Sequence, residues 1–235
     1  MMTFETIHGF QDFCRELHKA GFSVGSWTGN DEGVFSLNPW FGDNILWHTG
    51  DYETDPWQWR IRSVTECEDI AYAKLFFKKA GWLARSMYPT LMAVRRSHRS
   101  FDEWYFDGQV SDMEKRIYRA VEEAERAGTF SSLADLKRTA AGQKTDQSRF
   151  DAAITSLQMR MFLTIAGETF RFSQTGQTYG WPITTFRLTD HLFGEDMFAA
   201  SCRISRQDAI ENLTHHIHEL NPDARERVIV KFIAG

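Results

Sequence analysis

The segment whose residue types most directly suggest chemistry is Asp55-Pro-Trp-Gln-Trp-Arg60, where a carboxylate stands beside two indole rings. The proline restricts the backbone around Asp55, and indole faces can hold a planar or cationic ligand. Asp55 could therefore act as a general base or stabilise a developing cation, which makes it our candidate catalytic residue. The aromatic residues that would line a pocket around it are Trp47, Trp57, Trp59 and Tyr72.

The same segment also admits a structural interpretation, which we favour. An Asp-Pro pair commonly begins a turn. Trp57 and Trp59 could then pack against the first helix of the chain, because large aromatic side chains usually contribute to a core. Under this interpretation Asp55 organises the local backbone and has no part in a reaction.

A second candidate site is a band of positive charge in residues 71–100. This stretch holds seven basic residues and no acid, whereas residues 1–70 hold twelve acids and four bases, and the whole chain has a net charge of −5. Cations interleaved with aromatic rings could contact phosphates while a ring stacks on an exposed base. The alternative is a solvated face over an aromatic core. The candidate phosphate contacts are Lys74, Lys78, Lys79, Arg85, Arg95, Arg96 and Arg99.

A third candidate lies in residues 147–173, where apolar residues recur at helical spacing from Phe150 through Ile154 to Leu157. The opposite face of this helix carries small polar side chains that could approach the major groove of DNA. From residue 111 to 173 the chain holds ten bases and nine acids, so a role as a protein-contact module stays open. The candidate contacts of this region are Lys144, Ser148, Arg149 and Thr155.

The elements around this helix predict a winged helix over residues 109–175. Ser111 and Glu114 have the spacing of a capping box, and Ser132 with Asp135 opens a second, short helix that we expect to end near Gly142. After the third helix, two β-prone runs flank Ala166-Gly167-Glu168, which we interpret as the turn of a hairpin.

The rest of the chain is expected to enclose the winged helix in an α+β fold. The N-terminal α/β region, residues 1–108, would comprise a helix over 4–20, an irregular antiparallel sheet over 22–62, the basic aromatic band and an acidic aromatic linker over 101–108. Residues 176–235 would form a loop, up to about residue 194, and two helices beginning at Ser205 and Asn221. We expect all three parts to pack as one compact body.

Composition narrows the class of protein. Hydrophobic residues make up 42% and charged residues 25%, which is typical of a globular protein, and no apolar run reaches membrane-spanning length. The three cysteines are scattered, which favours a cytoplasmic protein without disulfides or a zinc cluster. We expect no cofactor and no metal, and we expect Glu211, His215 and His218 to face solvent.

Several short motifs resemble a known family. They are Asp55-Pro-Trp-Gln-Trp-Arg60, Phe76-Phe-Lys-Lys-Ala-Gly81, Tyr88-Pro89, Asp107-Gly108, Leu157-Gln-Met159 and Tyr179-Gly-Trp181. Over most of residues 40–190 the chain resembles a bacterial group of short AlkZ-related proteins. These are similar to the AlkZ/YcaQ winged-helix DNA glycosylases, which excise alkylated bases.

The resemblance implies a winged helix and a link to DNA, but it transfers no catalytic residue. The glycosylases use a Gln-x-Gln or Gln-x-Asp motif, and this sequence contains neither. Gln11 is followed directly by Asp12, Gln58 stands in Gln-Trp-Arg, and Gln158 stands in Gln-Met-Arg. Fold alone does not establish an activity.

The sequence therefore predicts a cytoplasmic DNA-binding protein that uses residues 71–100 and the helix near 144–160 on one surface. The first alternative is a DNA glycosylase acting on alkylated bases, with Asp55 in its pocket. The second is a winged-helix protein-interaction module, which would show no salt-dependent affinity for DNA.

Overall fold

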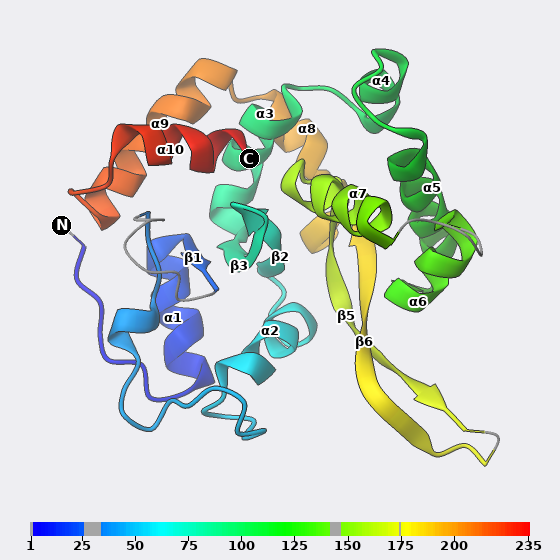
Figure 1. Ribbon diagram of the computed structural model, residues 1–235. Coiled ribbons are helices and arrows are strands. Elements are labelled where there is room, and N and C mark those ends of the chain that lie inside the picture. Colours follow the sequence, from blue (N-terminus) through cyan, green and yellow to red (C-terminus); the bar gives the residue numbers. More distant parts are fainter. Residues whose placement is uncertain (1, 26–33, 142–146, 174) are drawn as a thin grey trace.

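The computed structural model describes residues 2–25, 34–141, 147–173 and 175–235 (Figure 1). The helices are α1 (Phe10–Ala20), α2 (Pro56–Thr65), α3 (Tyr88–Arg96), α4 (Phe101–Phe106), α5 (Asp112–Arg126), α6 (Leu133–Leu136), α7 (Gln147–Met159), α8 (Met197–Cys202), α9 (Arg206–Leu220) and α10 (Glu226–Ala234). The strands are β1 (Phe22–Val24), β2 (Ile70–Phe76), β3 (Lys79–Ala84), β4 (Ser131–Ser132), β5 (Leu163–Phe172) and β6 (Thr178–Leu188). Short 3-10 helices are η2 (Asn38–Trp40), η3 (Arg85–Met87) and η5 (Leu192–Gly194), and η4 (Lys137–Ala141) is a π-helix that follows α6.

The fold is a mixed α/β arrangement in which helices surround two small antiparallel sheets. The first sheet has the order β1-β3-β2 and the second has the order β4-β6-β5. Each sheet belongs to its own hydrophobic core. The first core is built mainly from α1, α2, α3, α9 and α10, and the second from α4 to α7 with the start of the β5–β6 hairpin.

Aromatic rings fill the first core. Phe13 of α1 stacks on Trp59 of α2 with ring centroids 5.1 Å apart, and it meets the edge of Trp82 at 4.8 Å. The predicted packing of Trp59 on the first helix is thus confirmed, whereas Trp57 stays exposed. Gly21 ends α1 with a φ of 75°, a conformation that favours glycine.

The second core contains the three helices that the sequence predicts within residues 111–159, and a hairpin follows them. Ser111 and Glu114 form the predicted capping box of α5, and the Ser132 side chain accepts a hydrogen bond from the Asp135 amide at the start of α6. The predicted end of that helix, near Gly142, lies outside the described residues. The β5–β6 hairpin projects well beyond the rest of the molecule (Figure 1).

The hairpin differs from its prediction in the place of its turn. Ala166-Gly167-Glu168 lies inside β5, and the expected loop after residue 174 contains β6, so both predictions are wrong. Gly167 has a φ of 151°, and the strand register shifts between Ile165 and Gly167. The glycine therefore forms a β-bulge, which bends the strand without reversing it.

Four other predictions of secondary structure need correction. The first helix begins at Phe10, because residues 4–9 are not helical and Ile7 forms a β-bridge with Phe41. Within residues 22–62 the described chain forms one short strand, the 3-10 helix η2 and the start of α2, not an antiparallel sheet of its own. Residues 101–106 form α4, because Ser100 and Glu103 make a capping box. The last helix starts at Glu226 instead of Asn221, which adopts an extended backbone conformation after α9.

A buried ion pair joins the two cores. Arg96, at the end of α3, is fully buried and pairs with the carboxylate of Asp190, which follows β6. The Arg96 guanidinium carbon lies 4.4 Å from the ring centre of Phe162 and 4.6 Å from that of Phe198. Since Phe162 belongs to the second core, this arginine ties α3 to the hairpin side of the molecule.

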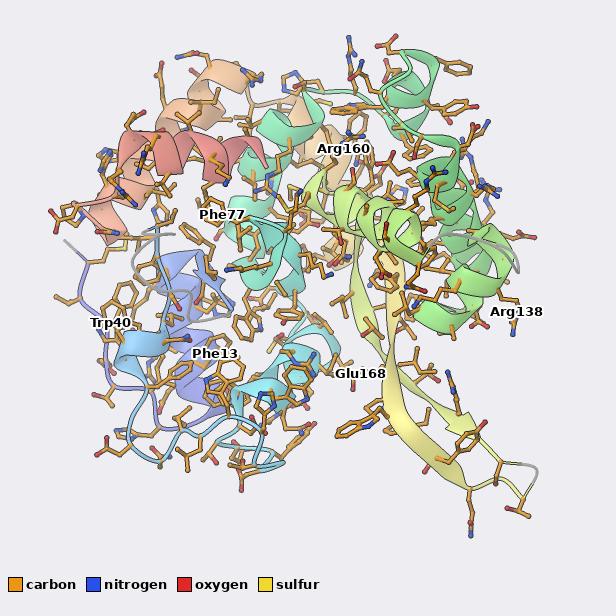
Figure 2. The ribbon with its side chains drawn as sticks, in the orientation of Figure 1. Phe13, Trp40, Phe77, Arg138, Arg160 and Glu168 are labelled. Carbon is orange, nitrogen blue, oxygen red and sulfur yellow. The ribbon has the colours of Figure 1, made fainter. Side chains whose placement is uncertain are left out.

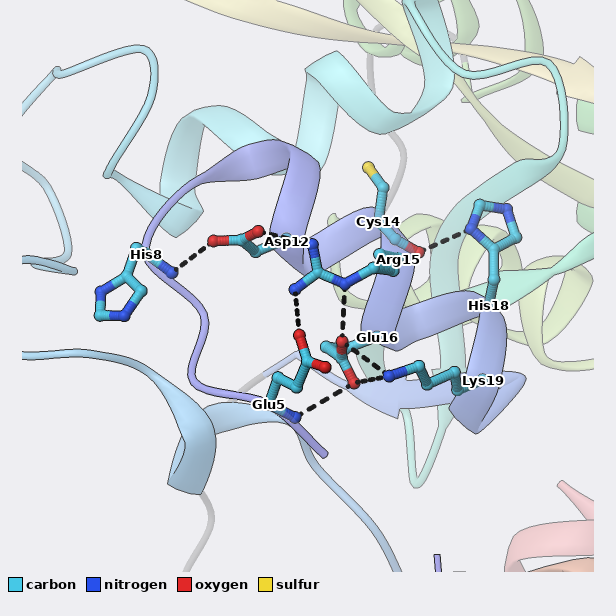
Figure 3. A network of polar contacts seen from close by, with 8 residues as sticks. All are labelled: Glu5, His8, Asp12, Cys14, Arg15, Glu16, His18 and Lys19. Atoms are coloured by element: carbon cyan, nitrogen blue, oxygen red, sulfur yellow. Dashed lines mark hydrogen bonds and ion pairs between the residues drawn. The ribbon is translucent and has the colours of Figure 1, made fainter. Parts of the chain in front are cut away.

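A second buried charge anchors the N-terminal segment to α1 (Figure 3). The Glu16 carboxylate accepts hydrogen bonds from Lys19 Nζ at 3.0 Å, Arg15 Nε at 2.9 Å and the backbone amide of Glu5 at 3.3 Å. Burial acts to raise the pKa of Glu16, but the hydrogen bonds from Lys19 and Arg15 hold it below its usual value. Across the described ranges, no helix is both long enough and apolar enough to span a membrane.

Candidate nucleic-acid interface

The structure brings part of the basic band next to α7. Lys74 Nζ lies 3.4 Å from Thr155 Oγ1, and the Lys74 amide donates to Gln158 Oε1 at 3.0 Å. The amide of Lys78, in the β2–β3 turn, lies 3.3 Å from the sulfur of Met159. The band and α7 therefore lie side by side at Lys74, Lys78 and Thr155.

This contact also limits how much of α7 is open. Ser148 and Arg149 are exposed in the first half of the helix, whereas Thr155 is half-buried and Met159 is buried under the β2–β3 turn. The Gln158 amide, which sequence reasoning missed as a positioning residue, is buried and fixes β2 against α7. Lys144 lies outside the described residues.

Two arginines of the basic band are not surface residues, which corrects their assignment as phosphate contacts. Arg95 is buried and donates to the carbonyl oxygens of Met159 at 2.9 Å and Phe232 at 2.8 Å. It thus neutralises the carboxyl ends of α7 and α10, which carry partial negative charge. Burial lowers the pKa of Arg95 to about 9. Arg96 is committed to Asp190.

Three further residues of the band are only partly available. Arg85 forms an ion pair with Glu195, and Arg99 pairs with Asp107 at 2.5 Å. Both pairs are solvent-exposed and weak, so either arginine could release its carboxylate and bind another anion. Lys79 is half-buried in β3. Of the seven predicted cations, Lys74 and Lys78 are both exposed and adjacent to α7.

Asp55 has a structural role in the loop that precedes α2. Its buried carboxylate accepts hydrogen bonds from the amides of Trp57 at 2.8 Å, His48 at 3.0 Å and Gly50 at 2.9 Å. It is the N-cap of α2, with Pro56 in the first turn. A carboxylate held by three amides and removed from solvent is not placed to act as a general base.

The predicted pocket aromatics do not converge on one cavity. Trp59 is a core residue, and Tyr72 is buried with its ring 5.0 Å from Trp82, where burial raises the pKa of Tyr72 to about 12. Trp47 and Trp57 are partly exposed on either side of His48. The Arg60 guanidinium carbon lies 3.3 Å from the centre of the Trp57 ring.

Arg60 also connects this aromatic surface to the hairpin. Its guanidinium lies 3.5 Å from the carboxylate of Glu168 on β5, where the hairpin passes α2 (Figure 2). Burial raises the pKa of Glu168, and the positive charge of Arg60 opposes that effect. The ion pair holds the root of the hairpin against α2.

A cavity lies apart from these aromatic residues. It has a volume of about 470 Å³. One wall is formed by the end of α2 and the start of β2, and the other by residues of β5, β6 and η5. Its lining combines the acids Glu66 and Glu68 with Arg187, the thiol of Cys67 and apolar residues such as Ile70. None of the four predicted pocket aromatics contributes to its lining.

Three exposed aromatic residues lie on the projecting hairpin, and one of them, Trp181, is the most exposed aromatic residue of the described chain. Trp181 is 88% exposed, Tyr179 is 53% exposed and Phe170 is 46% exposed. Arg171 pairs in register with Tyr179, so a cation accompanies the rings. Sequence reasoning missed these residues as contacts because it assigned Tyr179 and Trp181 to a loop. The usable signal was the placement of Tyr179, Trp181 and Ile183 at alternate positions, which is typical of a strand.

The geometry can be compared with known proteins. A family model described as AlkZ related matches residues 7–234 of the chain. The chain belongs to the AlkZ-related family. This match is longer than the 40–190 range in which the sequence motifs resemble the family, and it includes α1, α9 and α10. Membership of the AlkZ-related family suggests a function related to DNA. Searches of curated proteins and of solved structures found no match.

Proposed function

We propose that this AlkZ-related chain is a nucleic-acid-binding protein that contacts DNA through a winged helix. The unit would comprise α5, β4, α6, α7 and the β5–β6 hairpin. The chain order of these elements supports the proposal, as does the antiparallel strand order β4-β6-β5. In this arrangement the first half of α7 approaches a groove and the hairpin extends along the flanking backbone.

The observation that carries the proposal is the exposure of aromatic side chains on a hairpin that projects from the body. A single exposed aromatic residue needs no explanation, but several on one projecting element are typical of a surface that contacts a partner. Trp181 and Tyr179 could stack on unpaired bases or wedge between base pairs. Arg171 on the same hairpin could then neutralise a phosphate.

The distribution of charge supports weak, backbone-directed binding. Lys74, Lys78, Arg149 and Arg171 are exposed cations on α7 or the elements next to it. Four phosphate contacts would provide moderate affinity that decreases strongly with salt. The family membership agrees with DNA as the partner.

We propose binding without base excision. The glycosylase alternative relied on Asp55, whose carboxylate is buried and held by three backbone amides. A protein-interaction module is the competing interpretation, and it predicts no dependence of DNA affinity on salt.

Titration of fluorescently labelled duplex DNA tests the proposal. With four phosphate contacts, affinity should fall about 100-fold between about 50 mM and about 200 mM salt, because bound counterions are released. The variant Lys74→Glu/Lys78→Glu should bind more weakly and should lower the slope of log K against log salt by about two. The matched control is Arg203→Glu/Arg206→Glu at the end of α8 and the start of α9, which should retain wild-type affinity. Wild-type protein without measurable binding at low salt, or equal binding by the two double variants, would refute the proposal.

A further inference from the structure

Two cysteines that are far apart in the sequence lie in contact in the structure. Cys14 is on α1, and Cys67 is in the connection between α2 and β2. Their sulfur atoms are 3.6 Å apart, although 53 residues separate them in the chain. A disulfide requires a sulfur separation of about 2.05 Å, so only a small shift is needed to join them. Cys67 lies in a connection outside both α2 and β2, where such a shift is least restricted.

The two thiols differ in access. Cys14 is buried, whereas Cys67 is half-buried and lines the 470 Å³ cavity. A small oxidant entering this cavity would therefore meet Cys67 first. The buried Cys14 sulfur, 3.6 Å away, could then react with an oxidised Cys67 sulfur.

Neighbouring groups also make the two thiols unequal. The hydrogen bond between the two sulfur atoms lowers the pKa of Cys67 and raises that of Cys14. His18 lies one turn after Cys14 on α1, and its ring bridges the Cys14 carbonyl oxygen at 2.6 Å and the Asp69 carboxylate at 2.8 Å. The Cys14 sulfur points away from the Glu16 network, so it is not committed to that cluster (Figure 3).

We propose that Cys67 and Cys14 form a two-cysteine oxidation site for small hydroperoxides. The Cys67 thiolate attacks the terminal oxygen of the hydroperoxide and breaks its O–O bond. This gives the sulfenic acid of Cys67 and an alkoxide or hydroxide, which takes a proton from solvent. The Cys14 sulfur then attacks the sulfenic sulfur, forms the disulfide and releases water. In total the hydroperoxide gains two electrons and the dithiol loses two.

The disulfide would link α1 to the cavity wall. Its formation closes a long loop, so it stabilises the fold by restricting the unfolded chain. The oxidation site is independent of the proposed DNA interface, because neither cysteine lies on α7 or the hairpin.

The test is oxidation of the full chain by an equimolar amount of hydrogen peroxide, followed by peptide mapping under denaturing conditions. The expected product is a Cys14–Cys67 crosslink, reversed by dithiothreitol, with Cys202 still a free thiol. Oxidation should also raise the melting temperature by roughly 10 °C.

Variants separate the two steps. Cys14→Ser should accumulate a sulfenic acid at Cys67 that a dimedone probe labels, whereas Cys67→Ser should give no crosslink and no labelling at Cys14. Cys202→Ser is the matched control and should oxidise like the wild type. In the wild type, recovery of Cys14 and Cys67 as free thiols after oxidation, or faster oxidation of exposed Cys202, would overturn the proposal without any variant needing to fold.

Discussion

Replacement of Arg96 by methionine is expected to lower the free energy of unfolding by about 3–5 kcal/mol. Arg96 is fully buried, and its removal leaves Asp190 without its partner where the two cores meet. It also removes the cation between the Phe162 and Phe198 rings. Urea denaturation followed by circular dichroism measures the change, provided that the dependence on urea keeps its slope.

Arg99 provides the matched control for Arg96. It comes from the same basic band, but its pair with Asp107 is exposed on both sides. Arg99→Met should therefore change stability by only about 0–1 kcal/mol. Equal effects of the two substitutions would mean that the Arg96–Asp190 pair does not hold the two cores together.

Replacement of Asp55 by alanine is expected to destabilise the fold by about 3 kcal/mol. The change removes the N-cap of α2, which by itself contributes about 0.5–2 kcal/mol. It also leaves the amides of His48 and Gly50 without their acceptor. Asp55→Asn should lose less, because its amide oxygen can still accept one or two of these hydrogen bonds. Chemical denaturation monitored by tryptophan fluorescence reports the effect, because Trp57 and Trp59 lie in the capped helix.

Asp196 serves as the comparison for Asp55. Its side chain caps α8 by accepting one hydrogen bond, from the amide of Ala199. Asp196→Ala should therefore cost about 1 kcal/mol, as for an ordinary cap. An Asp55→Ala variant as stable as the wild type would show that the carboxylate does not organise the loop before α2.

Local signals allowed much of the helical structure to be predicted. Ser111, Ser132 and Ser205 each accept the hydrogen bond that their spacing to the next acidic residue predicts, because capping depends on residues three positions apart. The apolar spacing in residues 147–159 predicted α7, because helical periodicity is also visible over a short stretch of sequence.

The strands were harder to predict because their pairing is not local. Gly180 and Pro182 indicated a loop, since proline cannot donate to a sheet. In the structure, Pro182 lies where the β5–β6 register shifts, between the pairs Thr169–Ile183 and Arg171–Tyr179. A proline is tolerated at such an irregularity because the regular ladder of hydrogen bonds is interrupted there.

The candidate site was only partly predictable because the sequence shows which residues are charged but not which of them are buried. The run of basic residues includes Lys74 and Lys78, which lie beside α7. The same run included Arg95, whose burial depends on the ends of α7 and α10. Both helix ends lie outside residues 71–100, so the spacing of residues within this band cannot show that Arg95 is buried against them. Likewise, the exposure of Trp181 follows from the length of a hairpin whose second strand was not recognised.

The measurement that tests the central claim most directly is DNA binding by Trp181→Ala. The control is Phe106→Ala on α4, because Phe106 is 82% exposed and does not belong to the hairpin. Loss of one aromatic contact to DNA corresponds to about 1–3 kcal/mol, or a rise of about fivefold to 150-fold in Kd. Both variants are titrated with the same short duplex carrying one unpaired base, at low salt. We predict weaker binding by Trp181→Ala and unchanged binding by Phe106→Ala. Wild-type affinity in Trp181→Ala would contradict the proposal that the hairpin contacts DNA.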